Sequence, residues 1–438
     1  MVRRQNRLSA PFTNLLQALQ ALPLIPTRAG EGLGLMVGLL ALACSSEAEP
    51  AVEQVVDRPI VETVDTPLPG IGREFTRDFN DGDLAFSTPL HAADGLGPLY
   101  TRASCAACHD GGLRGPGLVQ KMSVVEADGV TPAADQGKLA YGHTVHPLTS
   151  PAGELGITPP VDDSSVKISE RLGPAVIGRG YMEAVLDSEI ERVAEEQAAR
   201  TDEIHGRVNR LPYASEPNVD KRFHDYKKGD LVIGRFGLKA RIATLDDFTA
   251  DAFQGDMGIT SPLRPDEFKN PNALEDRKPG VDVSYASVNM RANYVRVLEI
   301  PTRRGPQDAA RLFQDVQCAA CHVPSLRTRA DYPIDALADI DAPIYTDLLI
   351  HNMGEDLADG LPAADDVDGQ AGSFDWRTAP LIGLRFNRTF LHDGRAKSVE
   401  EAILMHRGVG SEANDSVARF EALSERERAL LVSFVESL

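Results

Sequence analysis

A chain of 438 residues and 47.3 kDa is long enough for two domains, each with its own hydrophobic core. Its formal net charge of −20 argues against nucleic acid as a partner. The same charge suits a basic redox partner, although an acidic surface also simply keeps a protein in solution. Four of the five cysteines belong to two short motifs, so no disulfide framework is expected.

The first 43 residues have the features of an export signal. Several arginines precede an uncharged apolar run at 34–43, which is too short to span a membrane as a helix. The run ends at Ala43-Cys44-Ser45, which resembles a bacterial lipobox, where the cysteine is acylated and becomes the first residue of the mature protein. The alternative is ordinary cleavage nearby, with Cys44 incidental. Both interpretations predict export to the periplasm or cell envelope, and the first makes a lipid anchor the only membrane attachment.

Residues 44–70 are rich in Glu, Asp, Pro and Val without a periodic pattern, which predicts a flexible linker. We predict an N-terminal domain over 71–300 that carries the motif Cys105-Ala106-Ala107-Cys108-His109. Its clearest expected helix is 181–200, where apolar residues recur at helical spacing. The segments 123–165 and 262–284 contain many turn-forming residues and predict loops.

A C-terminal domain over 301–438 repeats the motif as Cys318-Ala319-Ala320-Cys321-His322. A helix over 307–316 is expected to lead into it. Two further helices close the chain, one over 398–409 and one from 424 onwards. Each begins with the residues of a capping box, Ser398 with Glu401 and Ser424 with Glu427.

The repeated C-x-x-C-H sequence is the attachment signature of c-type haem. Two thiols three residues apart lie within one helical turn, so each can add to one vinyl group of a single porphyrin. The following histidine then reaches the iron as the proximal ligand. We therefore predict two covalently bound haems, haem 1 on Cys105, Cys108 and His109 and haem 2 on Cys318, Cys321 and His322. The alternatives are a structural zinc site with four thiolates and a redox disulfide, and both leave the two histidines unexplained.

The ligand on the opposite face of each iron distinguishes an electron carrier from an enzyme. For haem 2 the candidates are His351, Met353, His392, Met405 and His406. On a helix over 398–409, His406 shares one face with Val399, Ala402 and Ile403, whereas Met405 lies about 100° away. We therefore predict His406 as the second axial ligand; the alternative is an ordinary core or surface histidine.

For haem 1 the local pattern selects no distal ligand. The pool is His91, Met122, His143, His146, His205 and His224, and an open position is a further alternative.

Three further side chains are candidates for contacts to the haems. Trp376, the single tryptophan, is expected to be either a core residue or a relay between the haems. Arg377 and Arg395 suit the propionates, because a guanidinium binds a carboxylate through two hydrogen bonds, and surface ion pairs are the alternative. An acidic segment at 365–369 is a weak candidate for Ca²⁺, because its spacing differs from an EF-hand loop.

These residues together resemble the bacterial di-haem cytochrome c peroxidase superfamily, and most closely its subgroup of di-haem, thiol-oxidoreductase-like proteins. The resemblance rests on the two C-x-x-C-H motifs and on the segments 390–394 and 398–403 after the second. It implies that His109 and His322 are proximal ligands and that His406 occupies the distal position of haem 2. That position is often Met in the peroxidases, so His implies a more negative potential. The catalytic Glu or Gln of the peroxidases does not align with this chain.

The sequence therefore predicts a mainly α-helical protein with two cytochrome c-like haem domains, the first enlarged by loops. The expected function is an exported di-haem oxidoreductase that acts on peroxide, oxygen or an oxidisable protein, with a redox protein or small oxidant as partner. The alternatives are a non-catalytic electron carrier with two six-coordinate irons, and a haem-bearing binding or sensor protein.

Overall fold

The computed structural model describes residues 64–129, 131, 133–139, 143–150, 156, 163–267, 280–306, 309–361 and 371–438. The predicted export signal, Cys44, most of the linker and the acidic segment 365–369 lie outside these residues. Residues 61–438 form one compact unit. Within the described part, no helix has the length and apolar character needed to cross a bilayer.

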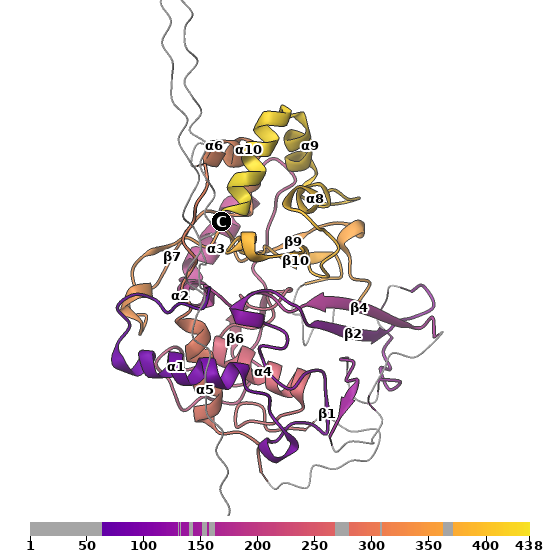
Figure 1. Ribbon diagram of the computed structural model, residues 1–438. Helices are drawn as coiled ribbons and strands as arrows, with labels where there is room; N and C mark the ends of the chain where they lie inside the picture. The colour runs from indigo at the N-terminus through magenta and orange to yellow at the C-terminus, as the bar shows by residue number, and fades with distance from the viewer. Residues whose placement is uncertain are drawn as a thin grey trace, which may run out of the picture. The chain divides into compact units, whose positions relative to one another are not determined.

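The described unit consists of helices and long loops, with few strands (Figure 1). These strands pair only into two-stranded antiparallel sheets. The helices are α1 Arg73–Ser87, α2 Arg179–Ala184, α3 Asp187–Ala198, α4 Leu245–Met257, α5 Tyr285–Arg296, α6 Ala310–Asp315, α8 Val399–Leu404, α9 Asn414–Ala422 and α10 Glu425–Glu436. The strands are β1 Leu99–Tyr100, β2 Leu118–Val124, β3 Leu148–Thr149, β4 Val166–Leu172, β5 Arg210–Pro212, β6 Leu231–Ile233, β7 Leu326–Arg327, β8 Asp341–Ala342, β9 Ile350–Asn352 and β10 Asp375–Arg377. The predicted helical character is confirmed.

Three helices of the N-terminal half pack side by side, with α5 between α1 and α4 (Figure 1). Gly82 on α1 permits this contact, because a Cβ there would lie 2.5 Å from Cβ of Tyr294 on α5. The start of α4 is fixed by Thr244, whose side chain accepts a hydrogen bond from the Asp247 amide, and its end by Gly258 at φ +65°. None of these helices was predicted from the sequence.

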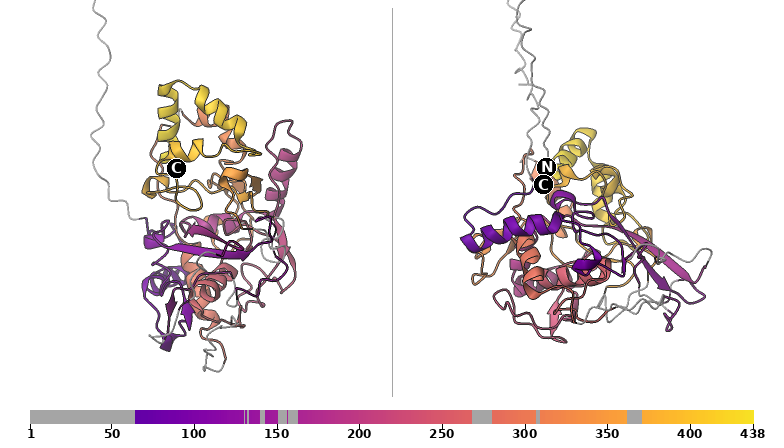
Figure 2. Two further views of the ribbon diagram at one scale, coloured as in Figure 1. Left: turned by 90° about the vertical axis from the view of Figure 1, so that its right-hand side faces the viewer. Right: turned by 60° about the horizontal axis from the view of Figure 1, so that its bottom comes forward.

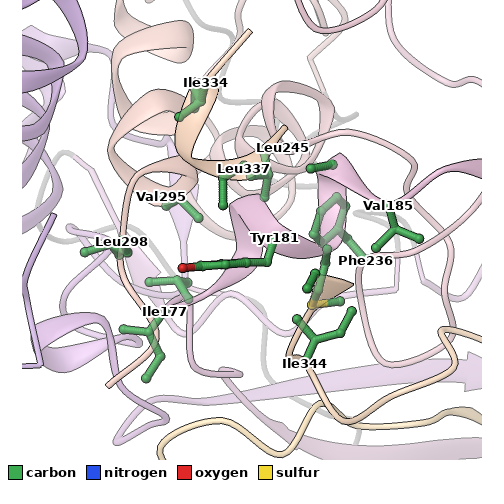
Figure 3. Packing of buried hydrophobic residues seen from close by; sticks show 14 of the residues in the cluster. Ile177, Tyr181, Val185, Phe236, Leu245, Val295, Leu298, Ile334, Leu337 and Ile344 are labelled. Carbon is green, nitrogen blue, oxygen red and sulfur yellow. The ribbon is translucent and has the colours of Figure 1, made fainter. Parts of the chain in front are cut away.

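The main hydrophobic core crosses the predicted domain boundary between residues 300 and 301. Figure 3 shows Tyr181, Leu245 and Val295 packed beside Leu337 and Ile344, which come from the C-terminal half of the chain. All of these side chains are buried. The predicted division into two domains therefore concerns only which residues hold each haem, and it stays a prediction.

The helix predicted over 181–200 is interrupted. Val185 and Leu186 are extended between α2 and α3. Val185 forms a bridge with Thr328, and the Leu186 amide donates to the Arg327 carbonyl. Pairing with a distant segment thus overrides the local helical pattern. The predicted loop at 123–165 is likewise bounded by β2 and β4, which pair along their full length.

The last helices group at one end of the unit (Figure 2). Phe313 of α6, Phe420 of α9 and Phe434 of α10 meet in a second buried cluster. The capping box of Ser424 and Glu427 is confirmed. At α8 only half of the predicted box forms, because Ser398 caps the Glu401 amide while the Glu401 carboxylate accepts from the Lys397 amide. The helix α8 is also shorter than predicted and ends at Leu404.

Candidate haem sites

A cavity in the C-terminal half collects the second motif and the predicted distal ligand. It encloses about 1840 Å³ of empty space, its open side included. Its lining contains Cys318, Cys321, His322 and His406, together with apolar side chains from α6, α8 and α10. Cys318 opens a single 3₁₀ turn, which keeps both thiols of the motif on one short stretch of chain.

The two histidines of this cavity have the geometry of iron ligands. His322 Nδ1 donates to the Tyr345 carbonyl at 3.1 Å, and His406 Nδ1 donates to the Ala402 carbonyl at 2.6 Å. In each ring the Nε2 lone pair is left for a metal. Burial, reinforced by the charge of His406, lowers the pKa of His322 to about 4, and burial also lowers the pKa of His406. Both imidazoles are therefore neutral at pH 7, the form that binds iron.

The competing candidates for haem 2 are placed differently. Met405 is exposed, which agrees with the helix-face argument for His406. His351 is fixed between two carboxylates, with Nε2 2.9 Å from Asp347 Oδ2 and Nδ1 2.7 Å from Glu412 Oε2. Both of its ring nitrogens are thus engaged, so it is a poor iron ligand. Met353 does line the cavity, so it stays an alternative ligand.

Trp376 lies in a stack between the two haem cavities. Its indole is parallel to the His392 ring, with centroids 4.1 Å apart, and Lys239 Nζ lies 3.8 Å from the centroid of the indole. Trp376 and His392 line the C-terminal cavity, whereas Lys239 lines the other one. The indole N–H donates to the Leu357 carbonyl at 2.9 Å. Trp376 is therefore a buried residue of the C-terminal cavity whose indole contacts a side chain from each cavity, and its role as a relay stays a prediction.

A larger cavity, of about 2660 Å³, collects the first motif in the N-terminal half. His109 repeats the pattern of the other two histidines, because its Nδ1 donates to the Pro174 carbonyl at 2.6 Å and burial lowers its pKa. The glycine-rich stretch contributes close packing, since a Cβ on Gly117 would lie 2.5 Å from Cys108 Sγ. Gly173 likewise permits close packing against His109, because a Cβ on Gly173 would lie 3.1 Å from His109 Cε1.

The structure narrows the pool of distal ligands for haem 1. Of the six candidates, only Met122 and His143 line this cavity. His143 Nδ1 donates to the Met122 carbonyl at 2.9 Å, which again leaves Nε2 available. The other four candidates, His91, His146, His205 and His224, do not line the cavity.

Buried arginines near both cavities fit haem propionates. Arg377 lines the C-terminal cavity as predicted, donates to the Gly237 and Thr378 carbonyls, and has its pKa lowered to about 10 by burial. Arg179 lines both cavities, and burial together with Arg377 lowers its pKa to about 9. Its one hydrogen bond within the described chain is to Met182 Sδ, so a propionate would supply the missing countercharge. Arg395 instead pairs with Asp393 and lines neither cavity, which matches the alternative of a surface ion pair.

The four motif cysteines do not form a zinc site. Two of them line each cavity. In the described chain, the one close group of potential metal ligands joins Cys321 to Asp347 and His351, and it contains no second cysteine. A four-thiolate site needs all four sulfurs around one ion, so this alternative is rejected.

The contacts that sequence reasoning missed come from segments far apart in the chain. Arg179, Lys239 and Pro174 have no motif around them, and only the fold brings them to the haem cavities. The one usable signal was the glycine at 173, which precedes the carbonyl that orients His109.

A family model supports the haem interpretation. Residues 156–438 match a family model described as "Di-haem oxidoreductase, putative peroxidase". Two solved structures also match. Hydrazine synthase from Kuenenia stuttgartiensis is 13% identical with a TM-score of 0.34, and the match covers 93% of this chain and 100% of that one. A variant of the diheme peroxidase BthA from Burkholderia thailandensis is 13% identical with a TM-score of 0.36, covering 83% and 85%. No curated protein matches the chain at a significant level.

Proposed function

The chain belongs to the di-haem oxidoreductase family, and from this premise we propose a peroxidase-like enzyme whose two c-type haems have different tasks. The observation that carries the proposal is the difference between the two cavities. One brings two neutral imidazoles, His322 and His406, to a mainly apolar pocket. The other brings His109 to a pocket rich in charged side chains.

Each haem would supply one-electron chemistry at its iron, and the chain's own residues would decide what that iron does. Two imidazoles on haem 2 leave no position for a substrate, so this site would store and pass electrons. The buried Arg179, shared by both cavities, would balance propionate charge between them. Peroxide reduction to water consumes two electrons, which a redox protein partner would deliver, and two protons.

Charged groups of the N-terminal cavity are suited to moving those protons. Lys121 Nζ donates to Thr144 Oγ1 at 2.6 Å and lies 3.9 Å from Asp256 Oδ1. Both Lys121 and Asp256 line the cavity. A lysine ammonium next to a carboxylate can donate a proton to a reactant, and solvent can then reprotonate the amine.

One observation favours the electron carrier as a second candidate. Within the described part of the chain, His143 bonds through Nδ1 and keeps Nε2 available in the same cavity as His109, so the two together could close both faces of haem 1. A haem with two tightly bound imidazoles has no open position, and it only transfers electrons.

The spin state of haem 1 separates these two functions. For the enzyme we expect one high-spin and one low-spin ferric signal in EPR spectra of the oxidised or half-reduced protein. The His143→Ala variant should leave those spectra unchanged. Two low-spin signals in both redox states of the wild type, with a high-spin signal appearing only in His143→Ala, would establish the carrier.

We also propose that the protein is exported and held in the cell envelope by lipid on Cys44. The supporting features are the apolar run at 34–43 and the small residues around Cys44. Cells fed an alkyne fatty acid should label the wild type, and Cys44→Ser should abolish the label while haem loading continues. A mature protein that begins beyond residue 44 would contradict the anchor.

A further inference from the structure

The N-terminal haem cavity is strongly cationic within an acidic protein. Eight arginine and lysine side chains line it, against two carboxylates, Asp251 and Asp256. The whole chain has a net charge of −20. The C-terminal cavity has three arginines and one carboxylate in its lining. Positive charge is therefore concentrated around haem 1.

Among the described residues, neighbouring carboxylates and the haem itself do not cancel this charge. Behind the lining, Asp359 pairs with Arg171 and Asp247 pairs with Arg264, which raises the carboxylates to four. Two haem propionates would bring the anions to six, still fewer than the eight cations. A low-dielectric pocket with surplus positive charge attracts anions and raises their local concentration.

Some of these cations have only neutral partners. Arg291 is 6% exposed, donates to the Ser287 and Ala85 carbonyls, and its Nε has no partner in the described structure. Arg102 donates to the Thr101 carbonyl at 2.7 Å. Arg102 also lines the cavity together with Cys108, so its charge lies in the pocket that holds the first motif.

We propose that small anions are the exogenous ligands that haem 1 preferentially admits, recognised by the surplus positive charge that Arg102 and Lys121 contribute to this cavity. The inference rests on the proposed function, because it requires a haem 1 position that a ligand can reach. It adds the chemical class of that ligand, which the family does not specify.

Ligand titration of the haem-loaded protein tests the proposal without measuring turnover. Azide and fluoride are the anionic probes, and imidazole is the neutral one. Each is titrated into the ferric protein and followed by absorption and EPR. For the wild type we expect anion affinity to fall as ionic strength rises, and imidazole affinity to stay constant. Arg102→Gln and Lys121→Gln should each weaken anion binding about three- to tenfold, with little change for imidazole.

Lys221→Gln is the matched control, because Lys221 is exposed, pairs with Asp225 and lines neither cavity. It removes the same charge and should not change any of the affinities. All titrations are repeated in a His143→Ala background, which removes the second imidazole of the cavity.

The outcomes separate the two proposals. If anions and imidazole bind with the same salt dependence, and the Arg102 and Lys121 variants match the control, the anion inference is overturned while an open haem 1 stands. If no probe binds even in the His143→Ala background, haem 1 is closed, and both the inference and the enzymatic function fail.

Discussion

The His406→Ala variant of the haem-loaded protein is expected to convert haem 2 from low-spin to high-spin. Its imidazole lines the same cavity as His322, and its Nδ1 donates to the Ala402 carbonyl, which leaves Nε2 available for the iron among the described residues. Alanine removes the ligand and leaves the iron with five ligands or with weakly bound water. EPR of the oxidised protein should gain a high-spin ferric signal, and the Soret band should shift accordingly.

Met405→Ala is the matched control for this prediction. Met405 is the adjacent residue, is exposed and does not line the cavity. Its loss should leave both haem signals unchanged. If His406→Ala kept a low-spin haem 2 while Met353→Ala lost it, Met353 would be the ligand and the assignment of His406 would be wrong.

The structure places His406 in the cavity lining, on the side that the helix-face argument predicted, although the helix itself was overestimated. Its role as a ligand stays a prediction. The structure ends α8 at Leu404, two residues before the histidine. The amide of His406 still donates to the Ile403 carbonyl, so the chain keeps turning and the side chain stays on the buried face. Local periodicity predicted the direction of this side chain because Val399 and Ile403 anchor the same face in the core.

Local patterns failed where partners come from distant segments. The break between α2 and α3 follows from pairing with Thr328, which no window around residue 185 contains. Lys239 approaches Trp376 only because the loop before α4 reaches β10. Local patterns also failed to select a distal ligand for haem 1. The candidate residues are distinguished by their positions in the fold and not by their neighbours in the sequence.

A buried charge network joins the N-terminal helices to the C-terminal half. Arg296 at the end of α5 is 1% exposed and donates to Glu183 of α2 and Asp246 of α4. Tyr332, from beyond the second motif, donates to Glu183 at 2.7 Å. Burial favours the neutral acid, but Arg296 overrides it and lowers the pKa of Glu183. The guanidinium thus holds charged carboxylates of two helices in the core that separates the haem motifs.

Arg296→Leu is therefore expected to destabilise the protein by about 3–5 kcal/mol, because it leaves two buried carboxylates without their cation. Urea unfolding of the haem-loaded protein, followed by circular dichroism, measures the loss. Arg192→Leu is the control, since that arginine pairs with Glu189 and Glu196 at the surface and should cost less than about 1 kcal/mol.

The pH dependence of this loss identifies its cause. A carboxylate whose folded pKa is depressed stabilises the native state fully above its unfolded value, 4.5 for Glu183, and loses that contribution as the pH falls further. The difference in unfolding free energy between the wild type and Arg296→Leu should therefore shrink below about pH 4.5. Adding Glu183→Gln to Arg296→Leu should restore part of the stability at pH 7, because one unpaired charge is removed. A deficit that is constant with pH and unchanged by Glu183→Gln would mean that Arg296 acts through packing on Phe223, which its guanidinium covers at 3.7 Å.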